Sequence, residues 1–483
     1  MSTMSNRHDC AWTRREFMGL LAGGAAGTAL APHAALSDGP VTPPNFVVIF
    51  VDDLGYDDLG CYWTPNGAPG YEQILTPNLD QMAADGIRFT DFYANAAVCT
   101  PARASMMTGC YSYRVGLNWH VLTPAATIGL NPNEQTIAKL LKARGYATGC
   151  FGKWHLGHHA PFYPTNHGFD RWLGLLLGNR DGTSEQLVRQ TELVADTGAF
   201  PHEVQTQILL EEALDFITAN QANPFYLYLP LTMPHTPLRA SNKFAGSSAR
   251  GPYGDVVAEV DWSVGRVLAR LQELGLDDNT LVLFTSDNGP WLCKGDDGGK
   301  AYPLNWGKST IFEGGYRVPC IARWPGKIPA GQVSSEPVGI IDLCPTLAAL
   351  AGAQVPRDRV IDGRSIWPIL NGTPGATSPH EALFYVDNNY VAAVRKGPWK
   401  FRREWLLEYG DVLTPAEMTA HLAGGGQHKE TLPEALYNLD DDIGETSNVL
   451  AQNPGVVNEL RGILLDFEAE IEANKRPVGS VAG

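Results

Sequence analysis

The sequence has little positive charge and few cysteines. Of its 483 residues, 36 are lysine or arginine and 52 are aspartate or glutamate, so the formal net charge is −16. A nucleic-acid partner would need a basic surface, and this balance therefore argues against one. An anionic ligand would have to be attracted by local cations. None of the eight cysteines forms a CxxC pair, which leaves no ordinary zinc-binding pattern.

A long hydrophobic run is missing as well. Residues 19–31 are the apolar part of the N-terminus, but they are too few and too rich in glycine to predict a stable membrane span. Arg14 and Arg15 precede them, and this order resembles a twin-arginine export signal, which we expect over residues 1–37. The alternative is a frayed tail that carries two arginines by chance. The signal predicts export by the twin-arginine machinery and a soluble mature protein in the periplasm or outside the cell.

The rest of the composition is that of a folded chain. Hydrophobic residues make up 44% and charged residues 18%, and 51 glycines with 34 prolines indicate ordered loops. Between residues 45 and 371, apolar segments typical of buried parallel strands alternate with amphipathic helical segments. This rhythm predicts an α/β domain in which helices sandwich a large mixed, mostly parallel sheet. We expect strands at 45–51, 87–93, 146–152, 224–229 and 280–286, and helices at 76–86, 134–144, 204–220 and 253–274.

The pattern changes near residue 380. Residues 372–379 are rich in proline, glycine and serine, and short apolar segments separated by turns follow them. Such a series predicts a small antiparallel sheet, and the periodic segment 453–475 predicts a helix that covers it. We therefore expect a smaller C-terminal α+β subdomain at 380–483.

A thiol and a guanidinium lie close together in the segment that begins at Cys99. Pro101 suits the first turn of a helix, so Cys99 is expected at a helix N-terminus, where unpaired N–H groups and the helix dipole favour an anion. Arg103 follows one helical turn later and would add a planar, permanently charged donor. A cysteine in this position can also be a buried small hydrophobic residue, and the segment alone does not decide between the two.

Polar side chains follow two of the predicted buried strands. Asp52 and Asp53 come after the first strand, and Asp287 and Asn288 come after the fifth. The carboxyl ends of strands are where α/β sheets bind ligands, although both segments would also make good solvated turns.

The segment from Cys99 to Gly109 resembles the signature of the formylglycine-dependent, Cys-type sulfatases, which are arylsulfatase-like members of the alkaline phosphatase superfamily. It reads Cys-Thr-Pro-Ala-Arg, followed by Thr108 and Gly109. The resemblance implies that a formylglycine-generating enzyme oxidises Cys99 to Cα-formylglycine. The aldehyde would hydrate to a diol, one hydroxyl would attack sulfur, and the second would later expel sulfate.

Three further segments resemble motifs of this family, namely residues 152–157, 234–237 and 307–319. The resemblance implies that Lys153 pairs with the hydrated formylglycine and that His155 deprotonates it to release sulfate. It places His235 near the leaving oxygen, gives Lys308 a contact with sulfate, and makes Asp287 the base for the attacking hydroxyl. The implied catalytic set is Cys99, Arg103, Lys153, His155, His235, Asp287 and Lys308.

The resemblance also implies a metal site at the strand ends. Its ligands would be oxygens of Asp52, Asp53, Asp287, Asn288 and the modified Cys99. An all-oxygen set suits a hard cation, so we expect Ca²⁺, with Mg²⁺ as the alternative, rather than Zn²⁺.

The expected function is hydrolysis of an organic sulfate ester, with a sulfated carbohydrate as the favoured substrate. One alternative is a phosphonate monoester or phosphodiester hydrolase with a similar site. A second is a catalytically silent protein that binds sulfated glycans and keeps Cys99 as a thiol. Loop residues that could form a sugar-binding platform are Trp119, His120, Asn179, Arg180, Trp291, Tyr302, Asn305 and Trp306.

Overall fold

The computed structural model describes residues 43–63, 70–118, 121–179, 186–196 and 202–481. The predicted export signal, 1–37, lies outside these residues. At the centre is β1 (Asn45–Val51), in which every residue is buried. Phe46, Val48 and Phe50 enter one hydrophobic core, whereas the residues between them enter a second. Because successive side chains of a strand point to opposite faces, β1 is covered on both sides, as its unbroken apolar sequence predicts.

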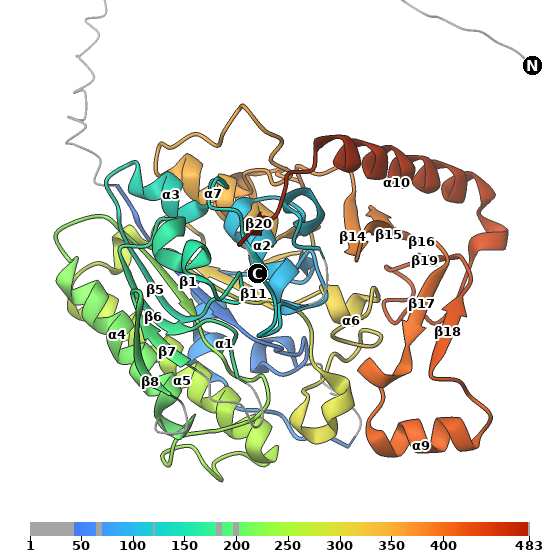
Figure 1. The fold of residues 1–483 in the computed structure, drawn as a ribbon, viewed down its shortest axis with the longest axis horizontal. Coiled ribbons are helices and arrows are strands. Elements are labelled where there is room, and N and C mark those ends of the chain that lie inside the picture. The colour runs from blue at the N-terminus through green and yellow to red at the C-terminus, as the bar shows by residue number, and fades with distance from the viewer. Residues whose placement is uncertain (1–42, 64–69, 119–120, 180–185, 197–201, 482–483) are drawn as a thin grey trace, which may run out of the picture. The chain divides into compact units, whose positions relative to one another are not determined.

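A ten-stranded sheet runs through the large domain (Figure 1). Its five central strands are parallel, and antiparallel strands extend it at both edges. In spatial order the strands are β12 (Gln332–Ser334), β2 (Ile87–Phe89), β11 (Cys320–Arg323), β10 (Thr280–Ser286), β1, β9 (Phe225–Pro230), β5 (Ala147–Lys153), β6 (Arg171–Leu175), β7 (Gln186–Arg189) and β8 (Glu192–Asp196).

Helices cover both faces of this sheet, which confirms the predicted fold class. One core contains residues of α1 (Pro77–Ala84), α4 (Gln205–Ala219) and α5 (Gly251–Glu273). The opposite core contains residues of α2 (Cys99–Thr108), α3 (Ile137–Lys142) and α7 (Leu343–Leu350). Shorter elements are β4 (Ile128–Gly129), which pairs with β20 (Gly479–Ser480), the buried α6 (Glu313–Tyr316) and α8 (Trp367–Leu370).

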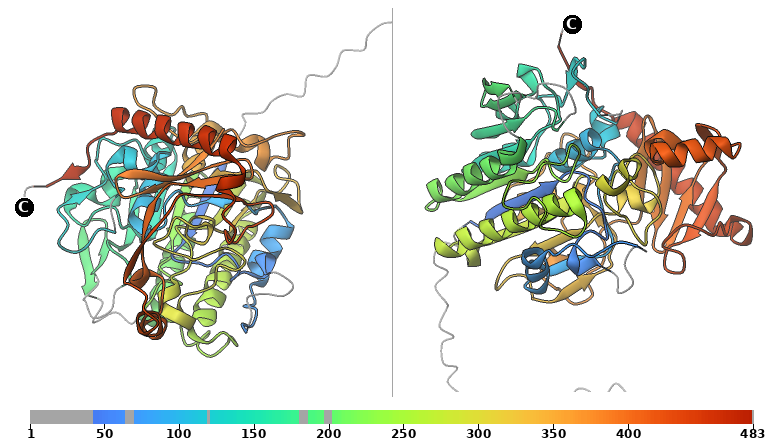
Figure 2. Two further views of the ribbon diagram at one scale, coloured as in Figure 1. Left: turned by 90° about the vertical axis from the view of Figure 1, so that its right-hand side faces the viewer. Right: turned by 90° about the horizontal axis from the view of Figure 1, so that it is seen from below.

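The C-terminal region forms a separate four-stranded antiparallel sheet beside the large domain (Figure 1), as the sequence predicts. Its strands are β14 (Leu383–Asp387), β15 (Tyr390–Lys396), β16 (Trp399–Arg402) and β19 (Ala435–Asn438). Helix α10 (Pro454–Asn474) lies across one face of this sheet (Figure 2), where its leucines pack on Val391, Val394 and Phe401. Between β16 and β19 the chain makes an arm that consists of β17 (Trp405–Glu408), α9 (Pro415–Ala423) and β18 (Lys429–Leu432).

Two expected elements differ from the structure. The expected strand 87–93 is divided into β2 and β3 (Phe92–Tyr93), and β3 leaves the large sheet to pair with β13 (Val338–Gly339). The division falls where Arg317 donates to the Thr90 carbonyl at 2.6 Å and to the Asp91 carboxylate at 2.8 Å. The helix expected from residue 134 begins only at Ile137, because the Thr136 hydroxyl caps it by accepting from the backbone N–H of Lys139.

Within the described residues, no helix is both long and apolar enough to cross a bilayer. None of the seven cysteines in this part of the chain forms a disulfide bond.

Candidate active site

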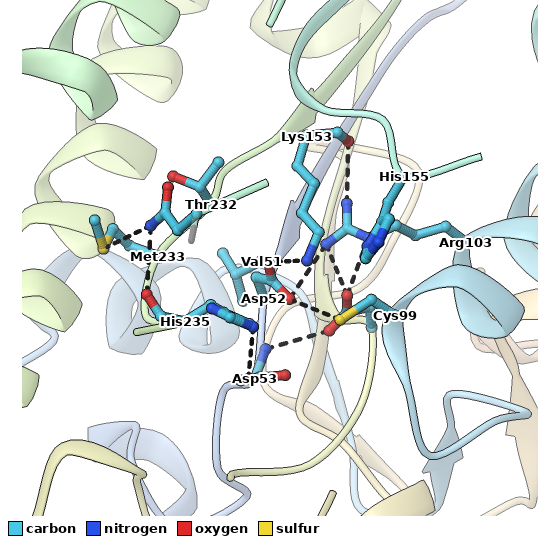
Figure 3. A network of polar contacts seen from close by, with 12 residues as sticks. Val51, Asp52, Asp53, Cys99, Arg103, Lys153, His155, Thr232, Met233 and His235 are labelled. Atoms are coloured by element: carbon cyan, nitrogen blue, oxygen red, sulfur yellow. Dashed lines mark hydrogen bonds and ion pairs between the residues drawn. The ribbon is translucent and has the colours of Figure 1, made fainter. Parts of the chain in front are cut away.

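Four neighbouring strands bring the predicted site residues to one edge of the sheet. Asp52 follows β1, Asp287 follows β10, His235 lies in the loop after β9, and Lys153 is the last residue of β5. The spatial order β10, β1, β9, β5 therefore places these side chains side by side at the carboxyl ends of parallel strands. Cys99 reaches the same place from the start of α2, and Figure 3 shows Asp52, Arg103 and Lys153 beside it.

Cys99 is the first residue of α2 and is buried, as the Pro101 turn predicts. Its Sγ lies 3.3 Å from Oδ1 of Asp52 and 3.6 Å from Nζ of Lys308. Burial, and then the negative charge of Asp52, raise the pKa of the Cys99 thiol. The thiolate is the reactive form of cysteine, so the unmodified side chain is poorly suited to act as a nucleophile here.

Arg103 is fully buried behind Cys99 and is held on both sides. Its Nε and Nη2 donate to Oδ2 of Asp287 at 3.0 and 2.7 Å, and its Nη1 donates to the Lys153 carbonyl at 3.2 Å. Nη2 also lies 3.6 Å from Oδ1 of Asp52. The guanidinium therefore ties together the ends of β10, β1 and β5, and it orients Asp287 toward the site.

Two lysines pair with the two adjacent aspartates. Nζ of Lys153 is 2.5 Å from Oδ2 of Asp52, and Nζ of Lys308 is 2.7 Å from each carboxylate oxygen of Asp53. Together with Arg103 and Asp287, these residues make a cluster of three cations and three carboxylates. An isolated buried charge is costly, and this pairing is what allows six ionisable groups to share one buried site.

The expected metal ligands lie close enough together to hold one ion. Ligand atoms of Asp52, Asp53, Cys99 and Asp287 all lie within 4.8 Å of one another. Asn288 donates through Nδ2 to Asp53 at 2.7 Å, while its Oδ1 is buried with no hydrogen-bond partner in the structure. A buried oxygen without a donor is expected of a ligand that faces a cation. Burial and the neighbouring Asp52 raise the pKa of Asp287 to about 7, so the carboxylates would gain from a further positive charge.

The two histidines of the site use one ring nitrogen each to bind a backbone carbonyl. Nε2 of His155 donates to the Leu122 carbonyl at 3.0 Å, and its Nδ1 is buried without a partner. Burial, and then the charge of Lys153, lower the pKa of His155 well below its usual value, so the ring is neutral near pH 7. Nδ1 of His235 donates to the Thr236 carbonyl at 2.5 Å, and its Nε2 lies 3.7 Å from Oδ2 of Asp53. Burial, and then Lys308, lower the pKa of His235 to about 4.

A cavity of about 630 Å³, here called the sulfate cavity, opens above Cys99. Five of the predicted catalytic residues line it, namely Cys99, Lys153, His155, His235 and Lys308. Of the expected sugar-binding residues, Asn179 and Trp291 line it, whereas Tyr302, Asn305 and Trp306 do not. Trp119, His120 and Arg180 lie outside the described residues. Sequence reasoning missed Lys294, Ser309 and Asp411, which also line the cavity.

Comparison with known proteins agrees with this geometry. The sulfatase family model matches residues 44–353, and the model for the C-terminal region of aryl-sulfatase matches residues 378–481. N-acetylgalactosamine-6-sulfatase of Sus scrofa is 38% identical over 463 residues, which cover 90% of this chain and 87% of that protein. Arylsulfatase A of Homo sapiens is 37% identical over 467 residues, which cover 89% of each chain.

The fold is also similar to that of a sulfatase. The crystal structure of PsFucS1 sulfatase from Pseudoalteromonas sp. matches with a TM-score of 0.80 and 27% sequence identity, covering 90% of this chain and 92% of that one. The family models together span most of the sequence, and both curated relatives match it over nearly its whole length. This chain therefore belongs to the sulfatase family of sulfuric ester hydrolases.

Proposed function

We propose that the protein releases inorganic sulfate from a sulfated carbohydrate, with residue 99 as the nucleophile in its formylglycine form. The observation that carries the proposal is the position of Cys99. It lies buried at a helix N-terminus, at the base of a large cavity, with Lys308 3.6 Å from its sulfur. This is a place where an anion would be bound and attacked, and the raised pKa of the thiol speaks against thiolate chemistry.

The charges of the cluster favour a sulfate ester once a divalent cation is present. The carboxylates of Asp52, Asp53 and Asp287 balance the three cations of the cluster, so a Ca²⁺ ion held by those carboxylates and Asn288 leaves a net positive charge. When bound, the ion neutralises the sulfate oxygens as charge builds on them. With Asp53 engaged in this way, the ammonium of Lys308 is available to a sulfate oxygen.

The remaining residues have roles that follow from their positions. As a hydrated aldehyde, residue 99 supplies one hydroxyl that attacks sulfur and a second that expels sulfate. Asp287, which Arg103 orients, accepts the proton of the attacking hydroxyl. Lys153 stabilises the resulting oxyanion, and the neutral His155 accepts the second proton through its unpartnered Nδ1.

His235 stands where the leaving oxygen would depart. Its Nδ1 is committed to the Thr236 carbonyl, so Nε2 is the atom that faces the cluster. A carbohydrate alcohol is a poor leaving group and must gain a proton as the S–O bond breaks. Burial lowers the pKa of His235 to about 4, so the ring is neutral near pH 7 in the free protein. To act as the acid, the ring must therefore bind a proton when the anionic substrate binds.

A panel of sulfated mono- and disaccharides tests the proposal, with release of inorganic sulfate as the readout. The relatives include an enzyme named for N-acetylgalactosamine 6-sulfate, which makes that sugar the first member of the panel. A phosphonate monoester and a phosphodiester belong in the same experiment. Faster hydrolysis of either phosphorus ester than of every sulfate ester would favour the alternative hydrolase, and binding of sulfated sugars without any turnover would favour the silent glycan-binding protein.

Removal of the metal is expected to abolish turnover and to lower the melting temperature. A cation that binds only the folded state adds about 2.7 kcal/mol of stability at a concentration 100-fold above its Kd. Ca²⁺ should therefore restore both activity and melting temperature after chelation. Asp53→Asn should remove this response, whereas the exposed Asp358→Asn, whose carboxylate pairs with Arg359, should keep it. No change in either readout after exhaustive chelation would show that the cluster is not a metal site.

Replacing Arg14 and Arg15 together by lysine is expected to block export, because the transporter recognises the arginine pair whereas general secretion tolerates lysine. The measurement is the amount of protein in the periplasmic fraction. Arg7→Lys is the matched control, since it makes the same change outside the pair, and it should leave the yield unchanged. Normal periplasmic yield of the double variant would point to another route of export.

A further inference from the structure

A second cavity of about 230 Å³ adjoins the sulfate cavity, and we call it the neighbour cavity. Val98, Ser309 and Asp411 line both cavities. Val98 directly precedes Cys99, and the backbone N–H of Ser309 donates to the Ala97 carbonyl at 2.9 Å, so the two cavities share a wall of hydrogen-bonded backbone. The neighbour cavity is smaller than the ~300–1,000 Å³ of a complete small-molecule site, so it suits one part of a larger ligand.

Two parts of the chain that are distant in sequence build its walls. The catalytic domain supplies Asn118, whose Nδ2 donates to Oδ1 of Asn389 at 2.9 Å and to the Asn388 carbonyl. The C-terminal region supplies the turn between β14 and β15 and strand β17. Across this part of the wall, the Trp405 indole donates to the Asp387 carboxylate at 2.6 Å. A sugar ring has polar substituents and apolar faces, and the mixture of aromatic and amide side chains in these walls suits both.

The two cavities differ in the charged residues that line them. Three lysines, Lys153, Lys294 and Lys308, and one acidic residue, Asp411, line the sulfate cavity. Among the described residues that line the neighbour cavity there are three acidic residues, Asp387, Glu408 and Asp411, and no lysine, arginine or histidine. Glu408 is half-exposed and pairs with Lys429 at 2.5 Å, but Lys429 does not line the cavity. A like-charged group that docks against such a wall is disfavoured.

We propose that the neighbour cavity binds the sugar attached to the sulfated one and selects a neutral or amine-bearing sugar over one that carries a sulfate or a carboxylate. The proposal rests on the proposed function, because it takes the sulfate cavity as the place of the ester. It gives the C-terminal arm a direct part in substrate choice. The carboxylates of the wall repel an anionic neighbour, whereas its aromatic and amide groups accept hydroxyl, acetamido or amino substituents.

The test uses disaccharides that share the sulfated sugar and differ only in its neighbour. The three probes carry a neutral hexose, a hexosamine with a free amine, and a uronic acid, and kcat/KM for sulfate release is measured for each. We expect kcat/KM for the first two probes to exceed that for the third by at least ~10-fold. The free-energy cost of like charges that face each other across an interface is larger than this ratio requires. Equal kcat/KM for all three would overturn the proposal.

Charge reversal at the wall separates this effect from general electrostatics. Glu408→Lys should raise kcat/KM for the uronic acid probe and reduce the selectivity at least ~3-fold, with Glu408→Gln between it and the parent protein. Glu404→Lys is the matched control, since Glu404 is an exposed residue next to the same strand that lines neither cavity. An identical change in both lysine variants would show that only net charge matters, and this would overturn the proposal.

Loss of the proposed activity and loss of the selection by the neighbour cavity give different results. If no probe releases sulfate, the proposed function is wrong and the neighbour cavity has no substrate to select. If all probes release sulfate with the same kcat/KM in the parent protein and in Glu408→Lys, the sulfatase activity stands and the selection by the neighbour cavity is wrong.

Discussion

Cys99→Ala is expected to reduce sulfate ester hydrolysis by at least ~10⁴-fold, as is usual when the nucleophile of an enzyme is removed. Alanine cannot be converted to formylglycine, so neither the attack on sulfur nor the expulsion of sulfate can take place. The fold should remain intact, because the change removes a single sulfur atom from a buried site. Its cost in stability should stay below the ~2–5 kcal/mol of deleting a large core side chain. The measurement is kcat/KM together with thermal unfolding.

Cys150→Ala is the matched control for this variant. Cys150 is equally buried, on β5, and it is a free thiol, so its loss changes a similar volume without touching the nucleophile. This control should keep its activity and show a comparable change in unfolding temperature. Substantial turnover by Cys99→Ala would remove the formylglycine mechanism.

His235→Ala is expected to lose ~10²–10⁴-fold in kcat/KM on a sulfated sugar, which is the usual range for general acid catalysis. On an activated aryl sulfate the loss should be far smaller, because an aryl oxide can leave without a proton. Comparing kcat/KM for both substrates reports on transition-state stabilisation from the free enzyme, provided that chemistry limits the rate.

A variant of Trp291 is the control for His235→Ala. Its ring packs against the imidazole with 5.3 Å between ring centres, so His235→Ala could also disturb the cavity wall. Trp291→Phe keeps an aromatic wall beside an intact histidine and should affect the two substrates to a similar extent. If His235→Ala also lowers both rates equally, His235 holds the sulfate in place and donates no proton.

The central sheet could be predicted because the local sequence of its strands indicates that they are buried. The strands β1 and β10 have the predicted bounds, since each contains an apolar run of at least four residues bounded by polar residues. The break between β2 and β3 could not be predicted, because it depends on Arg317, which lies more than 200 residues away in sequence. The strands β7 and β8, which end the sheet on the β6 side, are not predicted either, since no strong periodicity marks them.

The candidate site, like the fold, could be predicted only in part. Short motifs at strand ends predicted which residues would meet around Cys99, because carboxyl ends of parallel strands share one edge. Lys294 and Asp411 were not found, because no motif surrounds them and their positions depend on how distant segments pack. Asp411 lies in the arm between β16 and β19 of the C-terminal sheet and lines the cavity. In this arm β17 pairs with β18, although helix α9 separates the two strands in sequence.

Mass spectrometry of the peptide that contains residues 97–103, from protein made in its native host, tests the central claim most directly. We predict an aldehyde at residue 99, which reacts with carbonyl reagents, and no thiol at that position. Cys150 in the same sample should remain a thiol, which controls for non-specific oxidation. An intact thiol at Cys99 in protein that releases sulfate from its substrate would contradict the account.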